Sequence, residues 1–239
     1  MTLGLCASEE LRQMLIAHGV SPDKLRLHAL GIDTQRFQPR MDMFAGDGER
    51  PVRVLMVGRL VEKKGFHYGL EAFAQSQAAQ RARLTVIGEG PLGAALRTEA
   101  SQLGIADRVE FLGGLPHAEV IARMRDHDIL LAPCVIAENG DRDSGLIVLR
   151  EAASCGLVPI ATRMGGLPDS VDDNESGFLT EMRDVPAMSA RLEQLLTDPH
   201  LRASMGRASR EKMVREFDHS VSMPFLERAY DDARSMHAR

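Results

Sequence analysis

The stretch NGDRDSGLIVLREAASCGLVPIAT (139–162) contains, in order, a polar loop, a helical pattern and an apolar strand pattern. The helical run covers residues 146–155, and Gly156 is a typical residue for closing a helix. Residues 158–161 are apolar throughout, as expected of a strand buried on both faces. This loop–helix–strand order predicts one unit of an alternating α/β fold.

The same alternation recurs along the chain from a domain start near Pro51. We expect strands at residues 52–59, 82–90, 108–114, 128–134, 157–162 and 177–181. We expect helices at residues 66–77, 91–103, 117–125, 146–155, 185–197, 199–216 and 221–233. Continuous apolar strands separated by helices predict an α/β, Rossmann-like three-layer sandwich, with a mainly parallel sheet of about six strands.

The segment before this domain has a different character. Residues 2–6 resemble the end of a strand, Ser8 is a plausible N-cap for a helix over 9–18, and residues 25–29 form another short strand pattern. Residues 31–47 are rich in Gly, Pro, Asp and Met without periodicity, which is typical of a linker. We therefore divide the chain at residues 1–47, 48–218 and 219–239.

Composition excludes several classes of function. The chain has 239 residues, a net charge of −5 and no Trp, so nucleic acid is not an expected partner. Its three Cys residues have no metal-ligand spacing and read as free thiols in a reducing compartment. No apolar run reaches the ~18 residues of a membrane span and no signal peptide opens the chain, so a cytoplasmic location is expected.

The start of the helix in the opening stretch suits a phosphate. A helix that begins near Gly145 directs free N–H groups and the positive end of its dipole at the preceding loop. Glu151 lies about 9 Å further along the helix axis, at ~1.5 Å per residue. That distance matches the reach from a diphosphate to a ribose, whose two hydroxyls a carboxylate can accept. The alternative is an ordinary amphipathic helix with Glu151 on its solvent face.

The loop GRLVEKKG (58–65) follows the first strand of the main domain. In parallel sheets ligands bind at the carboxyl ends of strands, where this loop lies. Arg59 can bind phosphate oxygens through two N–H groups, and Lys64 adds a point charge. A solvated basic turn is the alternative; a crevice shared with the helix start near Gly145 would favour binding.

Three further motifs are weaker. Residues 88–93 match G-x-G-x-x-G, but no acid ends the next strand, so a tight turn is favoured over a nicotinamide or flavin site. Residues 141–143 form D-x-D, which could hold a divalent metal or simply be solvated. Residues 164–169, MGGLPD, would allow close approach of a ligand to backbone amides or form a plain turn. No His lies beside a Ser or Cys in an evident triad, which disfavours nucleophilic hydrolysis.

Together the motifs resemble one known family. The matching segments are GRLVEKKG (58–65), VIGEGPL (86–92), VEFLGGL (109–115), the E-x7-E-like pair Asp143 and Glu151, and ATRMGGLPDSV (161–171). In this order they resemble the retaining glycosyltransferases of family 4, group 1, which have the two-domain GT-B fold. The NGDRDSG loop is most similar to the exopolysaccharide, colanic-acid-type branch.

The resemblance implies a nucleoside-diphosphate sugar as substrate, with neither a cofactor nor a metal. Arg59 and Lys64 would bind the diphosphate, Asp143 would face the donor sugar, and these three residues would be catalytic. Glu151 would hold the ribose, and the base would lie near Leu112–Leu115. The donor-binding residues that the resemblance implies are Gly58, Arg59, Lys64, Leu112, Pro133, Ser144, Gly145, Leu146 and Glu151.

Two features depart from the family pattern. The first acidic position is normally Glu, and Asp143 is one methylene shorter. In addition, residues 1–30 resemble only the last strand and helix of the acceptor-binding N-terminal domain, so residues 1–47 are expected to be its remnant plus a linker. The final helix, 219–239, normally crosses back onto that missing domain and offers a surface for a homo-oligomer.

The expected function is therefore that of a donor domain of a hexosyltransferase. It would bind a nucleotide sugar for retaining transfer to a saccharide or lipid-linked acceptor, and the full-length enzyme could be peripheral to the membrane. The isolated chain is expected to be incomplete for catalysis. The alternatives are a non-catalytic nucleotide-sugar-binding fragment or subunit that needs a separate acceptor domain, and a GT-B-type sugar-nucleotide epimerase.

Overall fold

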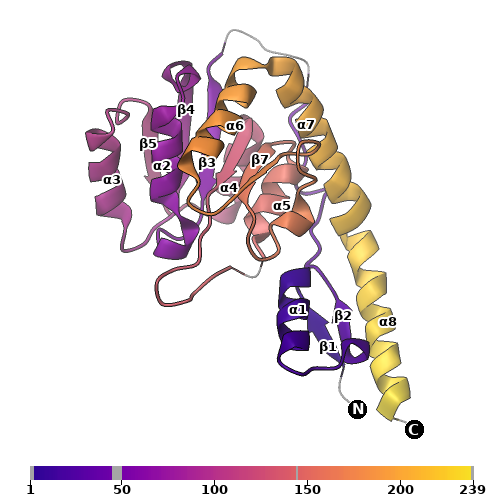
Figure 1. The fold of residues 1–239 in the computed structure, drawn as a ribbon. Helices are drawn as coiled ribbons and strands as arrows, with labels where there is room; N and C mark the ends of the chain where they lie inside the picture. The colour runs from indigo at the N-terminus through magenta and orange to yellow at the C-terminus, as the bar shows by residue number, and fades with distance from the viewer. Residues whose placement is uncertain (1–2, 45–49, 144, 238–239) are drawn as a thin grey trace.

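A computed structural model describes residues 3–44, 50–143 and 145–237 (Figure 1). Its main feature is a six-stranded sheet in the order β5-β4-β3-β6-β7-β8, in which all neighbours pair in parallel. The strands are β3 (Val52–Val57), β4 (Ala82–Ile87), β5 (Val109–Gly113), β6 (Ile129–Ala132), β7 (Val158–Thr162) and β8 (Phe178–Thr180). The predicted α/β fold with a parallel sheet of about six strands is confirmed.

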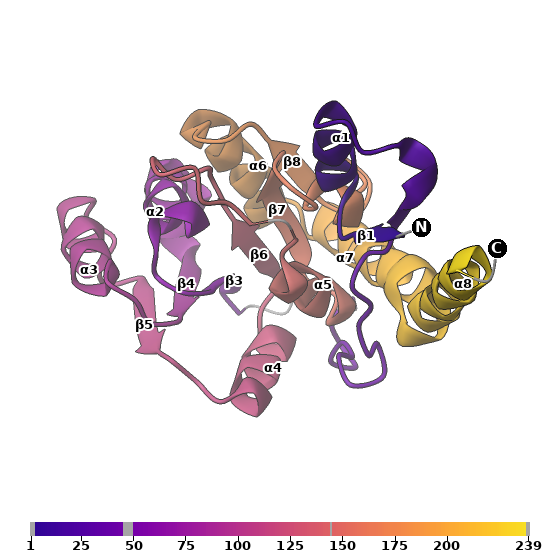
Figure 2. The same cartoon turned by 90° about the horizontal axis from the view of Figure 1, so that it is seen from below.

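Helices cover both faces of this sheet (Figure 2). One face carries α2 (Phe66–Gln75), α3 (Gly93–Gln102) and α6 (Val185–Thr197), and the other carries α4 (His117–Asp126) and α5 (Ile147–Ser154). The helix α7 (Pro199–Lys212) contacts α5, α6 and β7 and continues into a π-helical turn, η5 (Met213–Phe217). Short 3-10 turns are η1 (Pro22–Lys24), η2 (Glu62–Lys64), η3 (Ala78–Arg81) and η4 (Pro168–Ser170).

Burial on both faces explains why the strands read as continuous apolar runs. Along β3, Val54 and Met56 belong to the core under α2, α3 and α6, whereas Leu55 belongs to the core under α4 and α5. Successive side chains of a strand point to opposite faces, so both faces need apolar residues. The predicted helix near Gly145 begins two residues later, at Ile147.

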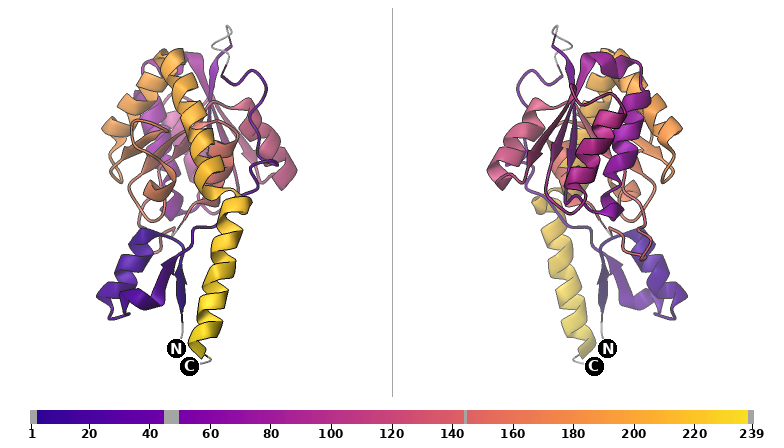
Figure 3. Two further views of the ribbon diagram at one scale, coloured as in Figure 1. Left: turned by 90° about the vertical axis from the view of Figure 1, so that its right-hand side faces the viewer. Right: turned by 90° about the vertical axis from the view of Figure 1, so that its left-hand side faces the viewer.

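The N-terminal segment forms a second, smaller unit. Its strands β1 (Gly4–Cys6) and β2 (Leu25–Leu27) pair in parallel, with α1 (Glu9–Ala17) between them in the chain. The long C-terminal helix α8 (His219–His237) runs beside this unit, away from the six-stranded sheet, and brings the two termini close together (Figure 3). The stacked rings of His28 and Phe225, with centroids 5.7 Å apart, are part of this contact.

The side of α8 that is buried differs from its most apolar side. In the chain as described, Ser222 and Ala229 are buried, whereas Val221 and Tyr230 are 44% and 63% exposed. The close approach at Gly31 explains why the side of α8 that carries Ser222 is buried. A Cβ at Gly31 would lie 2.0 Å from Oγ of Ser222. The small serine allows the helix to approach the segment after β2, whereas Val221 and Tyr230 face outward. The predicted division of the chain at residues 47 and 218 remains a prediction.

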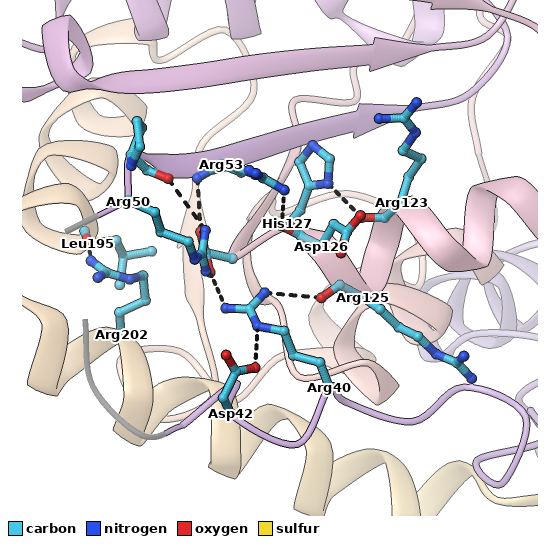
Figure 4. A network of polar contacts seen from close by, with 12 residues as sticks. Arg40, Asp42, Arg50, Arg53, Arg123, Arg125, Asp126, His127, Leu195 and Arg202 are labelled. Atoms are coloured by element: carbon cyan, nitrogen blue, oxygen red, sulfur yellow. Dashed lines mark hydrogen bonds and ion pairs between the residues drawn. The ribbon is translucent and has the colours of Figure 1, made fainter. Parts of the chain in front are cut away.

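Hydrogen bonds from several arginine side chains hold the linker against the amino end of the sheet (Figure 4). Asp128, just before β6, is buried and accepts hydrogen bonds from Arg40, from Arg50 and from the backbone N–H of Arg53. Burial alone would raise the pKa of Asp128, but these donors outweigh it and hold the pKa below its usual range. The linker segment around Arg40 is thereby held against the sheet domain.

Candidate functional site

The loops after β3 and β6 meet at the carboxyl edge of the sheet. Gly65 ends the η2 turn with φ 62°, and a Cβ at this position would lie 1.9 Å from the carbonyl oxygen of Pro133. Only glycine allows this approach without a shift of the backbone. The contact places the Lys63–Lys64 pair beside the loop that leads to α5, and the backbone N–H of Val135 donates to the carbonyl of Lys63 at 2.9 Å.

Both lysines of this turn bind the acids of the D-x-D segment. Nζ of Lys64 lies 2.9 Å from Oδ2 of Asp143, and their side chains are only 13% and 14% exposed. Nζ of Lys63 lies 3.0 Å from Asp141 and 3.7 Å from Asp143. Oδ2 of Asp143 is buried without a hydrogen bond of good geometry, so its contact with Lys64 is an ion pair only. An ammonium beside each carboxylate disfavours a divalent metal here.

No metal-binding group of three or more His, Cys, Asp or Glu residues occurs within residues 3–44, 50–143 and 145–237. The prediction that no metal takes part is not tested by this observation. The two lysines and the two acids form instead a compact charged cluster at the carboxyl edge of the sheet. A ligand with two phosphates would compete with Asp143 for Lys64.

Arg59 is exposed and lies near the same loop. The pKa of Asp141 is held below its usual range chiefly because Lys63 donates a hydrogen bond to it, and Arg59 adds a weaker attraction. Gly58 packs against the aliphatic stem of Lys64, with 3.4 Å between Cε and the position of a Cβ. The loop at residues 58–65 therefore places three basic side chains near Asp141 and Asp143.

A small apolar hollow lies next to this cluster. Lys64, Pro133, Cys134, Leu146 and Val148 are among the residues that line it. Burial raises the pKa of Cys134 to about 12, so the thiol stays protonated and is a poor nucleophile. The hollow lies between Lys64 of the loop at residues 58–65 and the start of α5.

The start of α5 has no side-chain cap. Leu146 occupies the N-cap position, where a side chain that accepts a hydrogen bond is usual, and Gly145 before it is exposed. The backbone N–H of Leu149 donates to the carbonyl oxygen of Leu146, and no side chain caps the two helical amides before it, which suits an anion. Ser144, which the sequence assigns to the same phosphate site, lies outside the described residues.

Glu151 lies further along α5 and faces α4. Its side chain is 12% exposed, and Oε1 is 3.1 Å from Nε2 of His117, the first residue of α4. No sequence motif identified His117 as a site residue. The available indication was its position directly after Pro116, at the start of a helix that follows a strand. The interpretation of Glu151 as an ordinary solvent-facing residue does not fit this burial and contact.

The glycines of residues 88–93 serve close packing of backbones. A Cβ at Gly88 would lie 1.8 Å from the carbonyl oxygen of Gly58, and one at Gly90 would lie 2.4 Å from that of Leu60. Between them, Glu89 accepts a hydrogen bond from the backbone N–H of Gly114 at 3.3 Å. The motif is a turn that fits against the GRLVEKKG loop, which agrees with the interpretation favoured over a dinucleotide site.

Apolar side chains continue the site beyond β5. Leu112 is partly buried and packs with Leu115, Leu146 and Val148 on the core under α4 and α5. Leu112 and Leu146 thus pack against the same core, and Leu146 also lines the hollow with Pro133. An apolar wall of this kind suits the face of a nucleotide base.

The small N-terminal unit touches the same edge of the sheet. Asp169 accepts a hydrogen bond from the backbone N–H of Glu9, at the start of α1, and Arg142 pairs with Glu10 at 3.1 Å. Burial raises the pKa of Asp169. The segment 164–169 is therefore a turn that docks α1, and the loop before α5 is bound from both units.

The structure thus brings several predicted site residues together. Lys64, Pro133 and Leu146 line one hollow, Asp143 pairs with Lys64 beside it, and Arg59 lies near Asp141 at the same edge. Glu151 lies further along α5 and contacts His117, and the structure adds Lys63 and His117 to the group. The role of each residue remains a prediction.

Comparisons with known proteins show which sequences this chain resembles. The family model described as "Glycosyl transferases group 1" matches residues 42–212. A protein of Salmonella typhimurium, provisionally named as the colanic acid biosynthesis glycosyltransferase WcaL, is 34% identical over 203 residues, covering 84% of this chain and 49% of its own length. A GDP-mannose-dependent alpha-(1-6)-phosphatidylinositol monomannoside mannosyltransferase of Mycolicibacterium smegmatis is 36% identical over 188 residues, covering 75% and 49%.

Solved structures are similar over nearly the whole chain. Anabaena Alr3699/HepE in complex with UDP has a TM-score of 0.83 at 20% identity, covering 96% of this chain and 64% of its own. Sucrose-phosphate synthase from Thermosynechococcus elongatus has a TM-score of 0.79 at 26% identity, covering 98% and 58%. The chain spans about half the length of the curated relatives it matches. Within the described residues, no helix is both long and apolar enough to cross a membrane.

Proposed function

The chain belongs to the group 1 glycosyltransferases, and from that premise we propose that it is the donor-binding part of a hexosyltransferase with the GT-B fold. It binds a nucleoside-diphosphate sugar and takes part in retaining transfer of the sugar to a saccharide or lipid-linked acceptor. The retaining mechanism and the assignment to family 4 belong to this proposal. Acceptor binding falls to a further domain, of which residues 1–30 represent the last part.

The observation that supports the proposal is that Lys64, which pairs with Asp143, and the uncapped start of α5 meet at one small hollow. A diphosphate bound beside this hollow would replace the carboxylate of Asp143 on Lys64, with Arg59 approaching from the exposed side. Preorganised cations and helix amides stabilise the charge that develops on a leaving diphosphate. This chemistry needs neither a cofactor nor a metal.

The released Asp143 then has a role of its own. Asp143 lies three residues before the N-cap Leu146 of α5, and its carboxylate, once separated from Lys64, faces the donor sugar. Being one methylene shorter than glutamate, it requires the sugar to lie closer to the loop. Glu151 accepts the ribose hydroxyls, and the base lies against Leu112 and Pro133. The relatives' names point to polysaccharide or glycolipid synthesis, which we propose for this chain as well.

Calorimetry with nucleoside diphosphates tests the proposal directly. The chain is titrated with GDP, UDP and ADP, and binding of at least one is expected, with competition by the corresponding sugar nucleotide. Lack of binding by all three would overturn the proposal.

An assay of released nucleotide, with and without added acceptors, then distinguishes transfer from mere binding. Release that requires a separately supplied acceptor domain would identify the chain as a binding subunit. A changed donor sugar without any acceptor would identify an epimerase.

A further inference from the structure

His117 connects the carboxylate of Glu151 with the linker that precedes the sheet domain. Nε2 of the imidazole lies 3.1 Å from Oε1 of Glu151, and Nδ1 lies 3.3 Å from Nη2 of Arg36. The three side chains come from α5, α4 and the linker. None of the sequence motifs that suggested the donor site includes His117 or Arg36.

The chemistry of the two contacts determines the tautomer of the imidazole. A guanidinium has donors only, so Nδ1 of His117 must accept the hydrogen bond from Arg36. The ring proton of a neutral imidazole then lies on Nε2, which donates to the carboxylate of Glu151. The order of donation is Arg36 to His117 to Glu151, with every donor matched by an acceptor.

The linker is itself held in place, so Arg36 is a fixed partner. Arg125 donates to the carbonyl oxygens of Arg36 and Gln38 at 2.9 and 3.2 Å, and Arg210 donates to that of Phe37 at 2.7 Å. The buried ring of Phe37 lies 5.8 Å from the imidazole, tilted by 54°. The imidazole is half exposed, packs on one side against Phe37 and has a polar contact at each ring nitrogen.

The arrangement occupies only one oxygen of Glu151. Within the residues that the structure describes, Oε2 accepts no hydrogen bond, whereas Oε1 is bound by His117. A carboxylate fixed through one oxygen presents the other in a defined direction. Groups held by a second layer of hydrogen bonds bind their ligands more tightly because less side-chain freedom is lost on binding.

We infer that His117 is a positioning residue, which orients Glu151 to accept the hydroxyls of a ribose, and that Arg36 maintains the tautomer this requires. The inference rests on the proposed function, because it assigns the ligand of Glu151 as the ribose of a nucleoside diphosphate. It adds that the linker is a functional part of the nucleotide site through Arg36. The class of ligand recognised is a ribonucleotide as distinct from a 2′-deoxyribonucleotide.

The test compares dissociation constants of the best-binding diphosphate among GDP, UDP and ADP with those of its 2′-deoxy form. Wild-type protein is expected to favour the ribonucleotide by about tenfold, the worth of one hydrogen bond to a charged group. His117→Phe should lose most of this preference by weakening the ribonucleotide alone. His117→Gln, whose amide can both donate and accept, should retain most of it.

Two further variants complete the set. Arg36→Met should reduce the preference, and His200→Phe, at an exposed position of α7, should leave it unchanged. A loss of general stability would weaken both nucleotides equally and would not change their ratio. An unchanged ratio in His117→Phe overturns the inference while leaving the proposed function intact, whereas absence of binding to all three diphosphates by wild type overturns both.

The tautomer is measured without any nucleotide. Nitrogen-15 chemical shifts of the imidazole ring are expected to show His117 protonated on Nε2 in the wild type and a mixture of tautomers in Arg36→Met. A ring protonated on Nδ1 in the wild type would contradict the inferred order of donation and overturn the role of Arg36.

Discussion

Lys64 and Asp143 face each other across the junction of the β3 and β6 loops, with 2.9 Å between Nζ and Oδ2 and little exposure of either side chain. The two residues are 79 positions apart in the chain, and the sequence assigned both to the same donor. In the structure, the negatively charged partner of Lys64 is the carboxylate of Asp143. A diphosphate bound as we propose would compete with Asp143 for Lys64.

Replacing this acid should strengthen nucleotide binding. Asp143→Asn removes the carboxylate that competes for Lys64, and we expect a nucleoside diphosphate to bind more tightly by about 1 kcal/mol, the scale of a partly exposed ion pair. Calorimetry measures the change. Asp141→Asn is the matched control, because Asp141 pairs with Lys63 and not with Lys64, and it should have a smaller effect. Weaker binding by Asp143→Asn would show that the carboxylate does not compete with the ligand.

Removing the exposed cation of the early loop should have the opposite effect. Arg59→Ala is expected to weaken diphosphate binding by roughly 1.5–3 kcal/mol, the worth of a hydrogen bond between charged groups. Arg53→Ala serves as control, since Arg53 is an exposed arginine near the start of the same strand, β3, at the opposite edge of the sheet. Equal affinities of Arg59→Ala and wild type would exclude Arg59 from the site.

The glycine that joins the two loops should not tolerate a side chain. Gly65→Ala places a Cβ 1.9 Å from the carbonyl oxygen of Pro133, so the loops must separate, and we expect a loss of unfolding free energy above ~2 kcal/mol. Gly104→Ala is the control, because Gly104 has a similar φ of 68° but no heavy atom within 4 Å of its Cβ position. Only the strain of the backbone, about 1 kcal/mol, should appear there. Denaturant unfolding of both variants gives the difference, and equal losses would remove the steric explanation.

A buried histidine away from the site should make the protein sensitive to acid. Nδ1 of His127 donates to the carbonyl oxygen of Arg123, and Nε2 accepts from the hydroxyl of Thr85. Burial lowers the pKa of His127 to about 4, against the attraction of Asp128 and Asp126 and with a small contribution from Arg53. The folded protein therefore keeps this ring neutral, whereas the unfolded chain takes up a proton near pH 6.5.

The direction in which stability changes with pH follows from proton uptake by the unfolded chain. Between pH 6.5 and 4 the unfolded state binds more protons, so the stability that this group contributes is present above pH 6.5 and falls as pH decreases towards 4. We expect a loss of about 1–2 kcal/mol at pH 5 relative to pH 7 from this residue. His127→Gln should unfold with a smaller pH dependence over this window, although with lower stability at pH 7. An identical pH dependence in wild type and variant would show that His127 is not the titrating group.

Local patterns were sufficient to predict the elements of the fold. The strand patterns at residues 52–59 and 128–134 correspond to β3 and β6, which are a few residues shorter at the ends. Each strand buries its successive side chains alternately in two cores, so its apolar pattern can be recognised from that strand alone. The ends differ because hydrogen bonding to neighbouring strands, rather than side-chain character, decides where pairing stops.

The charged group at the carboxyl edge could be predicted only in part. Arg59, Lys64 and Glu151 were identified because each lies in a short motif next to a strand or helix end. His117 and Lys63 were not, since their roles depend on partners 34 and 78 positions away. The exposed positions of Val221 and Tyr230 also followed from packing of α8 on the N-terminal unit, which no pattern within the helix indicates.

By itself the sequence determined the class of the fold and the short motifs of the site, because periodicity, glycine positions and helix starts are local properties of the chain. Only the tertiary structure decided which charges meet: Lys64 with Asp143, and Glu151 with His117 and Arg36. The physical reason is that an ion pair or hydrogen bond depends on a separation of a few ångströms between atoms. That separation is set by how the strands, loops and linker are packed. The sequence around a residue does not indicate which distant residue will lie beside it.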